Sequence, residues 1–401
     1  MADFYRLRNQ IKHYEWGSPD LIPRLEGITA DGRPWAEMWM GVHPASPSAV
    51  SFPSGDMWLG DLIAGDPRRF LGEKTAERYG NLPFLFKLIA AEKPLSIQAH
   101  PNLAQAREGW ERENRAGLAQ DAPNRSYRDS NHKPEIICAL TPFTGMCGFR
   151  SPKEIYRLLE AFLSLQPPVV VRNGFAPLMQ TLTPGAESLR DFLSVLFGLP
   201  SEVRKALTEF IADGNAGPFP ISGEWELMRD FSRQYPGDPA IIAPLYLNVF
   251  HLEPGEAIFL KAGILHAYIH GFAVELMTNS DNVLRGGLTV KHIDVPELMK
   301  VTDFNPCQPH VIKPEPGLSS YTYPAPCDEF SLTVLHGTGS LTAPAFARTP
   351  AICIVTGGEV FLESPGDVNG VIKQGESAFI PPGSGLVLQG RYTLYVASVP
   401  L

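Results

Sequence analysis

Two stretches of the chain follow one pattern without a gap, and this repeat constrains the fold more than any other feature. Residues 255–266 read GEAIFLKAGILH, and residues 375–386 read GESAFIPPGSGL. Both place Gly-Glu before four strand-forming residues and a second glycine three positions after that strand. A glycine there permits a tight turn, after which the chain re-enters the fold facing inward. The inward position is His266 in the first copy and Leu386 in the second, so one copy alone presents a potential ligand.

The pattern resembles the second motif of the cupin superfamily of small β-barrels, G-D-x4-P-x-G-x-x-H, from which Lys261 departs. The resemblance implies two cupin-like β-barrels of jelly-roll type, the second without its metal site. The predicted fold class is therefore mainly β, with a helical insertion that forms an α-helical domain of its own.

The boundaries of that insertion follow from periodicity. Four segments within residues 151–244 carry apolar residues at three- and four-residue steps, whereas the flanks read as short strands and turns. Ser151 and Ser201 occupy expected N-cap positions, and Pro152 suits a first helical turn. We predict a catalytic cupin-like domain from residues 1–150 and 245–320, a helical insertion over 151–244, and a degenerate cupin-like β domain over 321–401.

Composition limits the partners and the location of the protein. The 401 residues are 44% hydrophobic and 19% charged, which is enough apolar material for two or three packed units. A net charge of -9 argues against a general affinity for nucleic acid or for an anionic membrane. The five cysteines form no CxxC pair and the N-terminus has no apolar signal core, so a cytoplasmic protein with reduced thiols is expected.

A candidate metal site begins in the stretch KPLSIQAHPN, residues 93–102. Gln98 and His100 lie two residues apart in a strand-like segment, so both side chains would face the same way. Glu135 opens a second apolar segment, where a buried carboxylate is costly unless it is paired or binds metal. With His266 they make two nitrogen and two oxygen donors, a set that suits zinc. The alternatives are a hydrogen-bonded core histidine and a Glu135 paired with a nearby lysine.

A second concentration of polar residues follows in VELMTNSDNVLRGGLTVKHIDVPEL, residues 274–298. So many polar groups between apolar stretches fit a loop that lines a cleft, and a solvated surface loop is the alternative for any one of them. The candidates for substrate contact or catalysis are Glu275, Asp281, Arg285 and Lys291.

Several long blocks resemble the type I mannose-6-phosphate isomerases, from the start of the chain to about residue 310: PFLFKLIAAEKPLSIQAHP, NHKPEI, AGILHAY and VELMTNSDNVLRGGLTVKHIDV. The resemblance implies an enzyme with one zinc ion per chain that interconverts mannose 6-phosphate and fructose 6-phosphate. It implies metal ligands at Gln98, His100, Glu135 and His266, and an active-site arginine at Arg285. It also suggests substrate contacts at Ser96, Lys87 and Lys133.

Such an aldose–ketose isomerisation moves a proton between C2 and C1 through a cis-enediol, whose negative oxygen a metal or cation can stabilise. We expect Arg285 to stabilise the charge of the enediolate or of the phosphate. The expected base is Glu275, with His132, Asp281 and Lys133 as alternatives. The candidates for holding phosphate are Lys87, Lys93, Lys133 and Lys291, assisted by Ser96.

Two rival functions fit the same fold, namely an iron-dependent dioxygenase of the cupin type and a non-enzymatic sugar-phosphate sensor. The amide at Gln98 and the lysines near it argue against the first, and the intact candidate ligands with Arg285 argue against the second. We expect a monomer with a single activity, without the guanylyltransferase that is fused to some bacterial relatives. The sequence leaves open whether that activity serves mannose breakdown, GDP-mannose synthesis or both.

Overall fold

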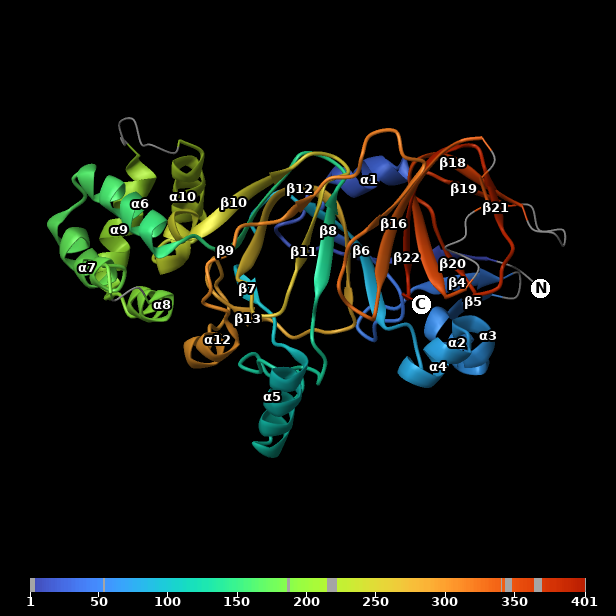
Figure 1. Cartoon of the computed structure of the whole chain (residues 1–401), viewed down its shortest axis with the longest axis horizontal. Coiled ribbons are helices and arrows are strands. Elements are labelled where there is room, and N and C mark those ends of the chain that lie inside the picture. Colours follow the sequence, from blue (N-terminus) through green and yellow to red (C-terminus); the bar gives the residue numbers. More distant parts are fainter. Residues whose placement is uncertain are drawn as a thin grey trace.

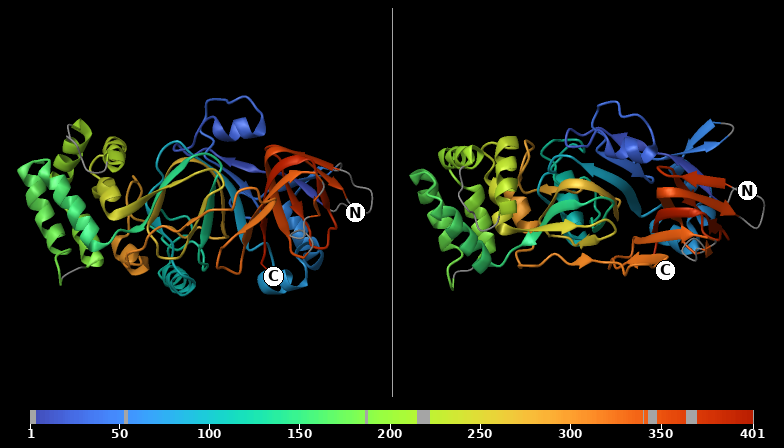
Figure 2. Two further views of the ribbon diagram at one scale, coloured as in Figure 1. Left: turned by 45° about the horizontal axis from the view of Figure 1, so that its top comes forward. Right: turned by 90° about the horizontal axis from the view of Figure 1, so that it is seen from above.

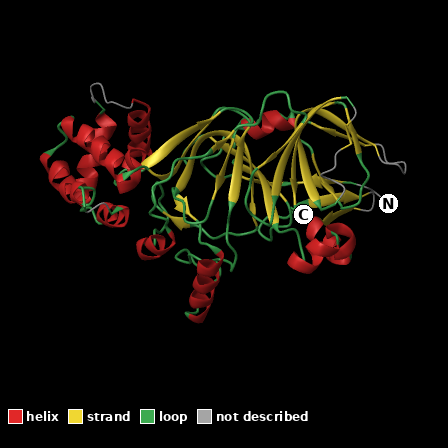
Figure 3. Ribbon diagram, in the orientation of Figure 1, coloured by secondary structure: helices red, strands yellow, loops and turns green. Residues whose placement is uncertain are grey.

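The computed structural model describes residues 4–52, 55–185, 188–214, 222–339, 341–342, 348–363 and 370–400. Two antiparallel sheets lie next to each other along the long axis of the molecule, and a block of helices forms the end away from the marked termini (Figures 1 and 2). Helices and strands take comparable shares of the chain (Figure 3). The predicted mixture of sheet and helix is confirmed, although "mainly β" understated the helices.

The sheet in the middle of the molecule, here the central sheet, holds most of the candidate site residues. Its strand order is open at both ends, from β14 through β11, β8, β12, β6 and β3 to β2, with β7, β9, β10 and β13 attached. The bounds are β2 Gln10–Lys12, β3 Glu37–Met40, β6 Phe84–Ala91, β7 Gln98–Ala99, β8 Glu135–Ala139, β9 Phe143–Phe149, β10 Leu247–Leu252, β11 Ala257–Leu260, β12 His266–Thr278, β13 Leu284–Arg285 and β14 Val311–Ile312.

The second sheet, here the C-terminal sheet, also takes strands from the N-terminal part of the chain. Tyr5 in β1 is paired with Phe379 in β20, and Leu7 is paired with Val50 in β4. The bounds are β1 Tyr5–Arg8, β4 Ala49–Phe52, β5 Gly55–Trp58, β15 Ser320–Tyr323, β16 Ser331–Thr338, β17 Leu341–Thr342, β18 Ala351–Glu363, β19 Gly370–Lys373, β20 Ser377–Ile380, β21 Val387–Gln389 and β22 Arg391–Ser398. The N-terminal part of the chain therefore contributes to both sheets.

The helical block follows the apolar periodicity of its sequence. The Ser151 hydroxyl accepts a hydrogen bond from the Glu154 N–H, and Pro152 occupies the first turn of α6, as predicted. The predicted N-cap at Ser201 is wrong, because extended Pro200 precedes α9 and Ser201 is already helical. The helices are α1 Leu21–Glu26, α2 Leu59–Gly65, α3 Pro67–Leu71, α4 Glu73–Tyr79, α5 Leu103–Arg115, α6 Pro152–Ser164, α7 Val169–Gln180, α8 Leu189–Phe197, α9 Ser201–Asp213, α10 Ser222–Gln234, η1 Pro239–Ile242, α11 Ala243–Tyr246 and α12 Val295–Val301.

An apolar core joins the two sheets. Phe86 and Leu88 of β6 belong to the same buried cluster as Ile352 of β18 and Phe379 of β20. Each of these side chains is almost fully buried, and burying one of this size stabilises a fold by roughly 1.5–3 kcal/mol. The sheets are therefore packed face to face.

The sequence repeat folds into the same local structure twice. The short strand after Gly-Glu is β11 in the first copy and β20 in the second. The turn glycines Gly263 and Gly383 have φ values of 81° and 82°, a left-handed conformation that side chains disfavour. The predicted strand and turn are confirmed in both copies. In the part of the chain that the structure describes, no helix combines the length and apolarity needed to cross a membrane.

Candidate metal centre and active-site cavity

Three buried side chains from distant parts of the sequence converge in the central sheet. Glu135 begins β8, His266 begins β12 directly after the Gly263 turn, and His100 follows β7. Their ligand atoms all lie within 4.8 Å of one another. Nε2 of His266 is 2.9 Å from Oε1 of Glu135, and Nε2 of His100 is 3.5 Å from Oε2. The structure therefore brings three of the four predicted ligands together.

Gln98, the fourth predicted ligand, lies beside this triad. In strand register it is opposite His266 on β12 and opposite Arg285 on β13. The strand β7 is only two residues long, so His100 lies just beyond it instead of within a longer strand as the sequence suggested. The amide of Gln98 faces a cavity shared with Arg285.

Hydrogen bonds fix both imidazoles in the orientation that a metal ligand needs. Nδ1 of His100 lies 2.7 Å from the carbonyl oxygen of Asn282, and Nδ1 of His266 lies 2.8 Å from that of Ile264. A carbonyl oxygen only accepts, so Nδ1 carries the proton in each ring. The Nε2 lone pairs are thereby left free to point at Glu135.

The donor atoms of the triad fit a bound cation. Oε2 of Glu135 and Nε2 of His266 are buried without a hydrogen-bond partner. An unsatisfied buried acceptor is costly, and Nε2 of His266 also faces the other carboxylate oxygen, Oε1 of Glu135, at 2.9 Å, where a cation would satisfy both atoms. Two imidazole nitrogens and one carboxylate are a common zinc set. The residues present therefore fit a divalent metal with at least one further position for Gln98, water or substrate.

The protonation states agree with this interpretation. Burial, followed by the nearby Lys133 ammonium, lowers the pKa of His100 to about 4. Burial acts to raise the pKa of Glu135, but Lys133 and His100 outweigh it and hold that pKa well below its usual range. Near neutral pH the imidazole is neutral and the carboxylate is charged, which are the forms that bind metal.

A cavity of about 1020 Å³ opens beside the triad and collects most of the predicted site residues. Those that line it are Ser96, Gln98, Lys87, Lys93, Lys133, Glu275, Asp281, Arg285 and Lys291. Among the predicted catalytic and substrate-binding residues, His132 does not line the cavity: its Nε2 lies 3.0 Å from Oε1 of Glu329, in the loop before β16. Gln234 and Tyr235, at the end of α10, complete one wall.

Deep in the cavity, Lys87 lies between two carboxylates. Its ammonium donates to Oε2 of Glu275 at 3.1 Å and lies 3.9 Å from Oε1 of Glu37. The indole of Trp39 donates to Glu37 at 2.6 Å, and Lys87 lies 5.0 Å from the centre of the Trp39 ring. Burial acts to lower the pKa of Lys87, but the two carboxylates outweigh it and raise that pKa, so Lys87 stays protonated.

Near the mouth of the cavity, positive charges gather without acidic partners. Burial, followed by the like charge of Arg128, lowers the pKa of Arg285. Burial, then Arg285 and Arg128, lowers the pKa of Lys291. Within the described residues, none of the side chains of Arg285, Lys291 and Arg128 forms an ion pair. A dianion placed among them would relieve this repulsion, so the cluster suits a phosphate group.

Sequence reasoning missed several residues that line the cavity, among them Glu37, Trp39, Arg128 and Tyr268. The Tyr268 hydroxyl donates to Oε1 of Glu135 at 3.1 Å. Tyr268 lies two residues after His266 in β12, so strand alternation puts both on one face, which is a signal that could have identified it. Arg128 lies in an irregular segment, where its N–H donates to the Asn282 side chain at 2.7 Å, and no local pattern marks it.

Comparisons with known proteins agree with this geometry. A family model of the phosphomannose isomerase type I catalytic domain matches residues 4–152. Mannose-6-phosphate isomerase of Escherichia coli K12 is 39% identical over 382 residues, 94% of each chain. The human protein of that name is 34% identical over 366 residues, 83% of this chain and 82% of its own.

Solved structures extend the likeness to the whole fold. A zinc-bound mannose 6-phosphate isomerase superimposes with a TM-score of 0.88 at 36% identity, covering 100% of both chains. The apo form from Salmonella typhimurium gives a TM-score of 0.87 with the same identity and coverage.

Proposed function

The chain belongs to the type I phosphomannose isomerase family, and from this premise we propose that it is a zinc-dependent mannose-6-phosphate isomerase. It interconverts mannose 6-phosphate and fructose 6-phosphate through a cis-enediol. The observation that carries the proposal is the buried triad of His100, Glu135 and His266, whose ligand atoms converge beside a cavity lined by Gln98 and by the cations Arg285, Lys291 and Arg128.

We assign one zinc ion to His100, Glu135 and His266, with Gln98 as a fourth ligand. When bound there, zinc supplies a Lewis acid that polarises the sugar oxygens next to the reacting carbons. The tautomers fixed by Asn282 and Ile264 support this assignment, because each leaves Nε2 free.

The phosphate is assigned to the cationic cluster of Arg285, Lys291 and Arg128. The guanidinium of Arg285 forks onto two oxygens, and its place opposite Gln98 puts it next to the metal site. Lys93 and the Ser96 hydroxyl lie along the same cavity and are assigned to the substrate as well.

The proton transfer is assigned to Glu275. Burial acts first to raise its pKa, ahead of the opposing effect of Lys87, and a raised pKa makes a carboxylate a better base near neutral pH. Glu275 takes the C2 proton of the open aldose on one face and returns it at C1. Protonated Lys87, held 3.1 Å away, offers positive charge or a proton to the neighbouring sugar oxygen.

Three candidates take lesser roles in the proposal. Lys133 lies 3.4 Å from Oε2 of Glu135, which suits orientation of the metal ligands and contact with substrate. Asp281 lies 3.4 Å from Nε2 of His43 and faces the cavity, where a carboxylate can bind sugar hydroxyls. Catalysis by His132 stays a prediction, and its contact with Glu329 favours a structural role.

We also propose how the chain is divided into domains. The repeat supports two cupin-like units, the first from residues 1–150 and 245–320 and the second from 321–401, with the helical insertion over 151–244 between them. Strands β1, β4 and β5 lie within the first range but pair in the C-terminal sheet, so we propose that the units share the N-terminal part of the chain. A monomer in the cytoplasm remains our proposal.

The two rival functions are not favoured by the relatives, which are mannose-6-phosphate isomerases from bacteria and mammals. The deciding assay follows conversion of mannose 6-phosphate to fructose 6-phosphate before and after removal of metal by a chelator. We expect turnover to vanish with the metal and to return when zinc is added. Turnover that a chelator does not affect would refute the metal assignment, and iron with oxygen uptake would support the dioxygenase.

A further inference from the structure

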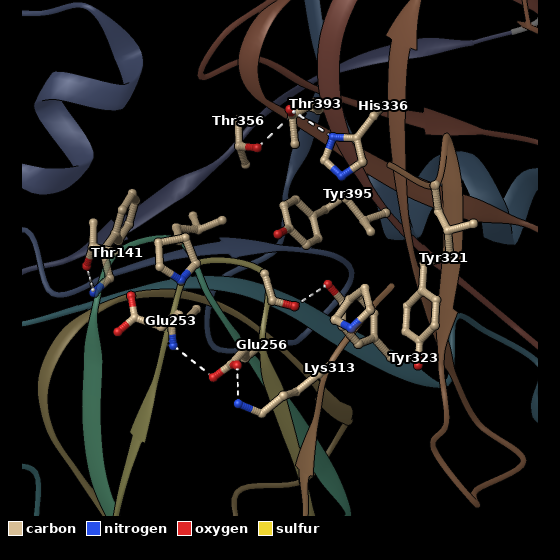
Figure 4. Close-up of a pocket in the computed structure, with 18 of the residues that line it drawn as sticks. Thr141, Glu253, Glu256, Lys313, Tyr321, Tyr323, His336, Thr356, Thr393 and Tyr395 are labelled. Carbon is tan, nitrogen blue, oxygen red and sulfur yellow. Dashed lines mark hydrogen bonds and ion pairs between the residues drawn. The ribbon is translucent and has the colours of Figure 1, made fainter. Parts of the chain in front are cut away.

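A second cavity, of about 860 Å³, lies between the central and C-terminal sheets and is separate from the metal centre (Figure 4). The central sheet contributes Phe272 of β12 and the residues at the end of β8. The C-terminal sheet contributes side chains of β15, β16, β18 and β22. The volume falls within the range of small-molecule sites, which often form where two packed units meet.

The walls combine aromatic surface with hydroxyl groups. Tyr321 and Tyr323 lie edge to face, with ring centres 5.1 Å apart, and Phe272 of the central sheet also lines the cavity. Nδ1 of His336 lies 3.3 Å from the Thr393 hydroxyl, and Figure 4 shows both beside the Thr356 hydroxyl. Aromatic faces and neutral hydrogen-bonding groups together are what binds the apolar and hydroxylated faces of a sugar ring.

The side chains that line the cavity leave no excess of positive charge, because Arg24 and Lys313 are outnumbered by Glu253, Glu256 and Glu315. Lys313 is paired with Glu256 at 2.6 Å, and this ion pair lowers the pKa of Glu256. Glu256 also accepts a hydrogen bond from the Glu253 N–H at 3.0 Å. Arg24 is offset by Glu253 and Glu315 in the same lining. This cavity therefore lacks the uncompensated positive charge that marks the phosphate end of the active-site cavity.

We propose that this cavity is a second small-molecule site, which binds an uncharged, ring-shaped polyol of hexose size. The site touches the strands that carry the metal ligands. Ala139 in its wall ends the strand that Glu135 begins, and Phe272 lies six residues after His266 in β12. The hydroxyl of Tyr323, also in the wall, donates to the Gly255 carbonyl at the start of the first copy of the repeat.

The test is saturation-transfer NMR on the full zinc-loaded chain with D-mannose, D-glucose and myo-inositol as probes. Saturating mannose 6-phosphate, with the fructose 6-phosphate formed from it, keeps the active site occupied. We expect saturable binding of at least one probe, with a Kd in the millimolar range. Thr356→Phe, which fills the cavity, and His336→Ala, which removes a hydrogen-bonding ring, should each weaken that binding by about tenfold or more.

Thr322→Phe is the matched control, because Thr322 is exposed on the face of β15 opposite Tyr321 and Tyr323. It should leave probe binding unchanged, and normal isomerase activity in all three variants would show that each is folded. The proposal fails if no probe binds, if the sugar phosphates displace the probe, or if neither cavity variant weakens its binding.

Discussion

The two copies of the repeat share their backbone and differ in the side chains that carry chemistry. In the first copy the N–H of Gly255 donates to Ala139 at 2.8 Å, and in the second the N–H of Gly375 donates to Val355 at 2.9 Å. Glu256 and Glu376 each accept a hydrogen bond from the N–H three residues earlier. The Gly-Glu pair therefore forms the same turn in both copies and does not distinguish them in function.

The difference lies at two inward positions. His266 of the first copy corresponds to Leu386, which is buried among the apolar residues of the C-terminal sheet. The strand partners reveal the second position: Leu260 is opposite Glu135, whereas Ile380, its counterpart, is opposite Ala351. The second copy thus lacks both the imidazole and the carboxylate. The same backbone motif therefore carries the proposed metal centre in the central sheet and an apolar core in the C-terminal sheet.

The largest effect is expected when the first copy is changed to resemble the second. His266→Leu removes one of three charged or imidazole ligands, so we expect stoichiometric zinc and measurable turnover both to disappear. Metal analysis and the isomerase assay check this. The reverse change, Leu386→His, should gain no zinc because Ala351 supplies no carboxylate; zinc bound by that variant at a second site would contradict the assignment of the two positions.

Arg285→Ala tests whether Arg285 acts in catalysis without contributing to metal binding. Arg285 forms none of the triad contacts, so zinc content should stay at one ion per chain. The loss of a guanidinium that stabilises phosphate or enediolate charge should lower kcat/KM by about 10²–10³-fold. Arg285→Lys should recover part of that loss, since it keeps the charge and loses the fork. Normal turnover of the alanine variant would remove Arg285 from the mechanism.

Leu386→Ala tests the second copy as a structural unit. Truncating a buried leucine costs about 2–5 kcal/mol of unfolding free energy, which urea titration of the zinc-loaded protein measures. Zinc content and KM should not change, because Leu386 lies in the other sheet. A loss of zinc with unchanged stability would show that the C-terminal sheet serves the metal centre directly.

The smallest effect expected concerns pH and His100, the buried imidazole that lies beside His266 of the first copy. The pKa of His100 falls from an ordinary 6.5 to about 4 on folding, so the folded state favours the neutral ring. The neutral His100 ring contributes fully to the free energy of unfolding above pH 6.5. This contribution, about 3 kcal/mol, is lost as the pH falls from 6.5 through about 4. Unfolding of the zinc-free protein across this range should show the loss, and His100→Asn should flatten it. An identical pH profile in the variant would assign the effect elsewhere.

The sequence predicted the local features of this molecule well. The turns at Gly263 and Gly383 and the cap of α6 at Ser151 follow from short patterns, because glycine conformation and capping act locally. The pairing of Tyr5 with Phe379 could not be predicted, since strand alternation specifies a face and not a partner.

Which residues line the active-site cavity was equally hard to predict from sequence. Arg128 and Glu37 reach it from segments whose own sequence gives no reason for their direction. The contact of His132 with Glu329 depends on how the C-terminal part of the chain packs, so its orientation was beyond sequence reasoning. Residue types that bind a metal or a phosphate can be recognised from sequence, whereas the orientation of those on loops depends on tertiary contacts.

The most direct test of the account is anomalous diffraction at the zinc edge on crystals of the zinc-loaded protein. We predict one peak, between Nε2 of His100, Nε2 of His266 and the carboxylate of Glu135, and none between Leu386 and Ala351. The absence of a peak at the triad, or a second peak in the C-terminal sheet, would contradict the claim that one copy of the repeat kept the metal centre and the other lost it.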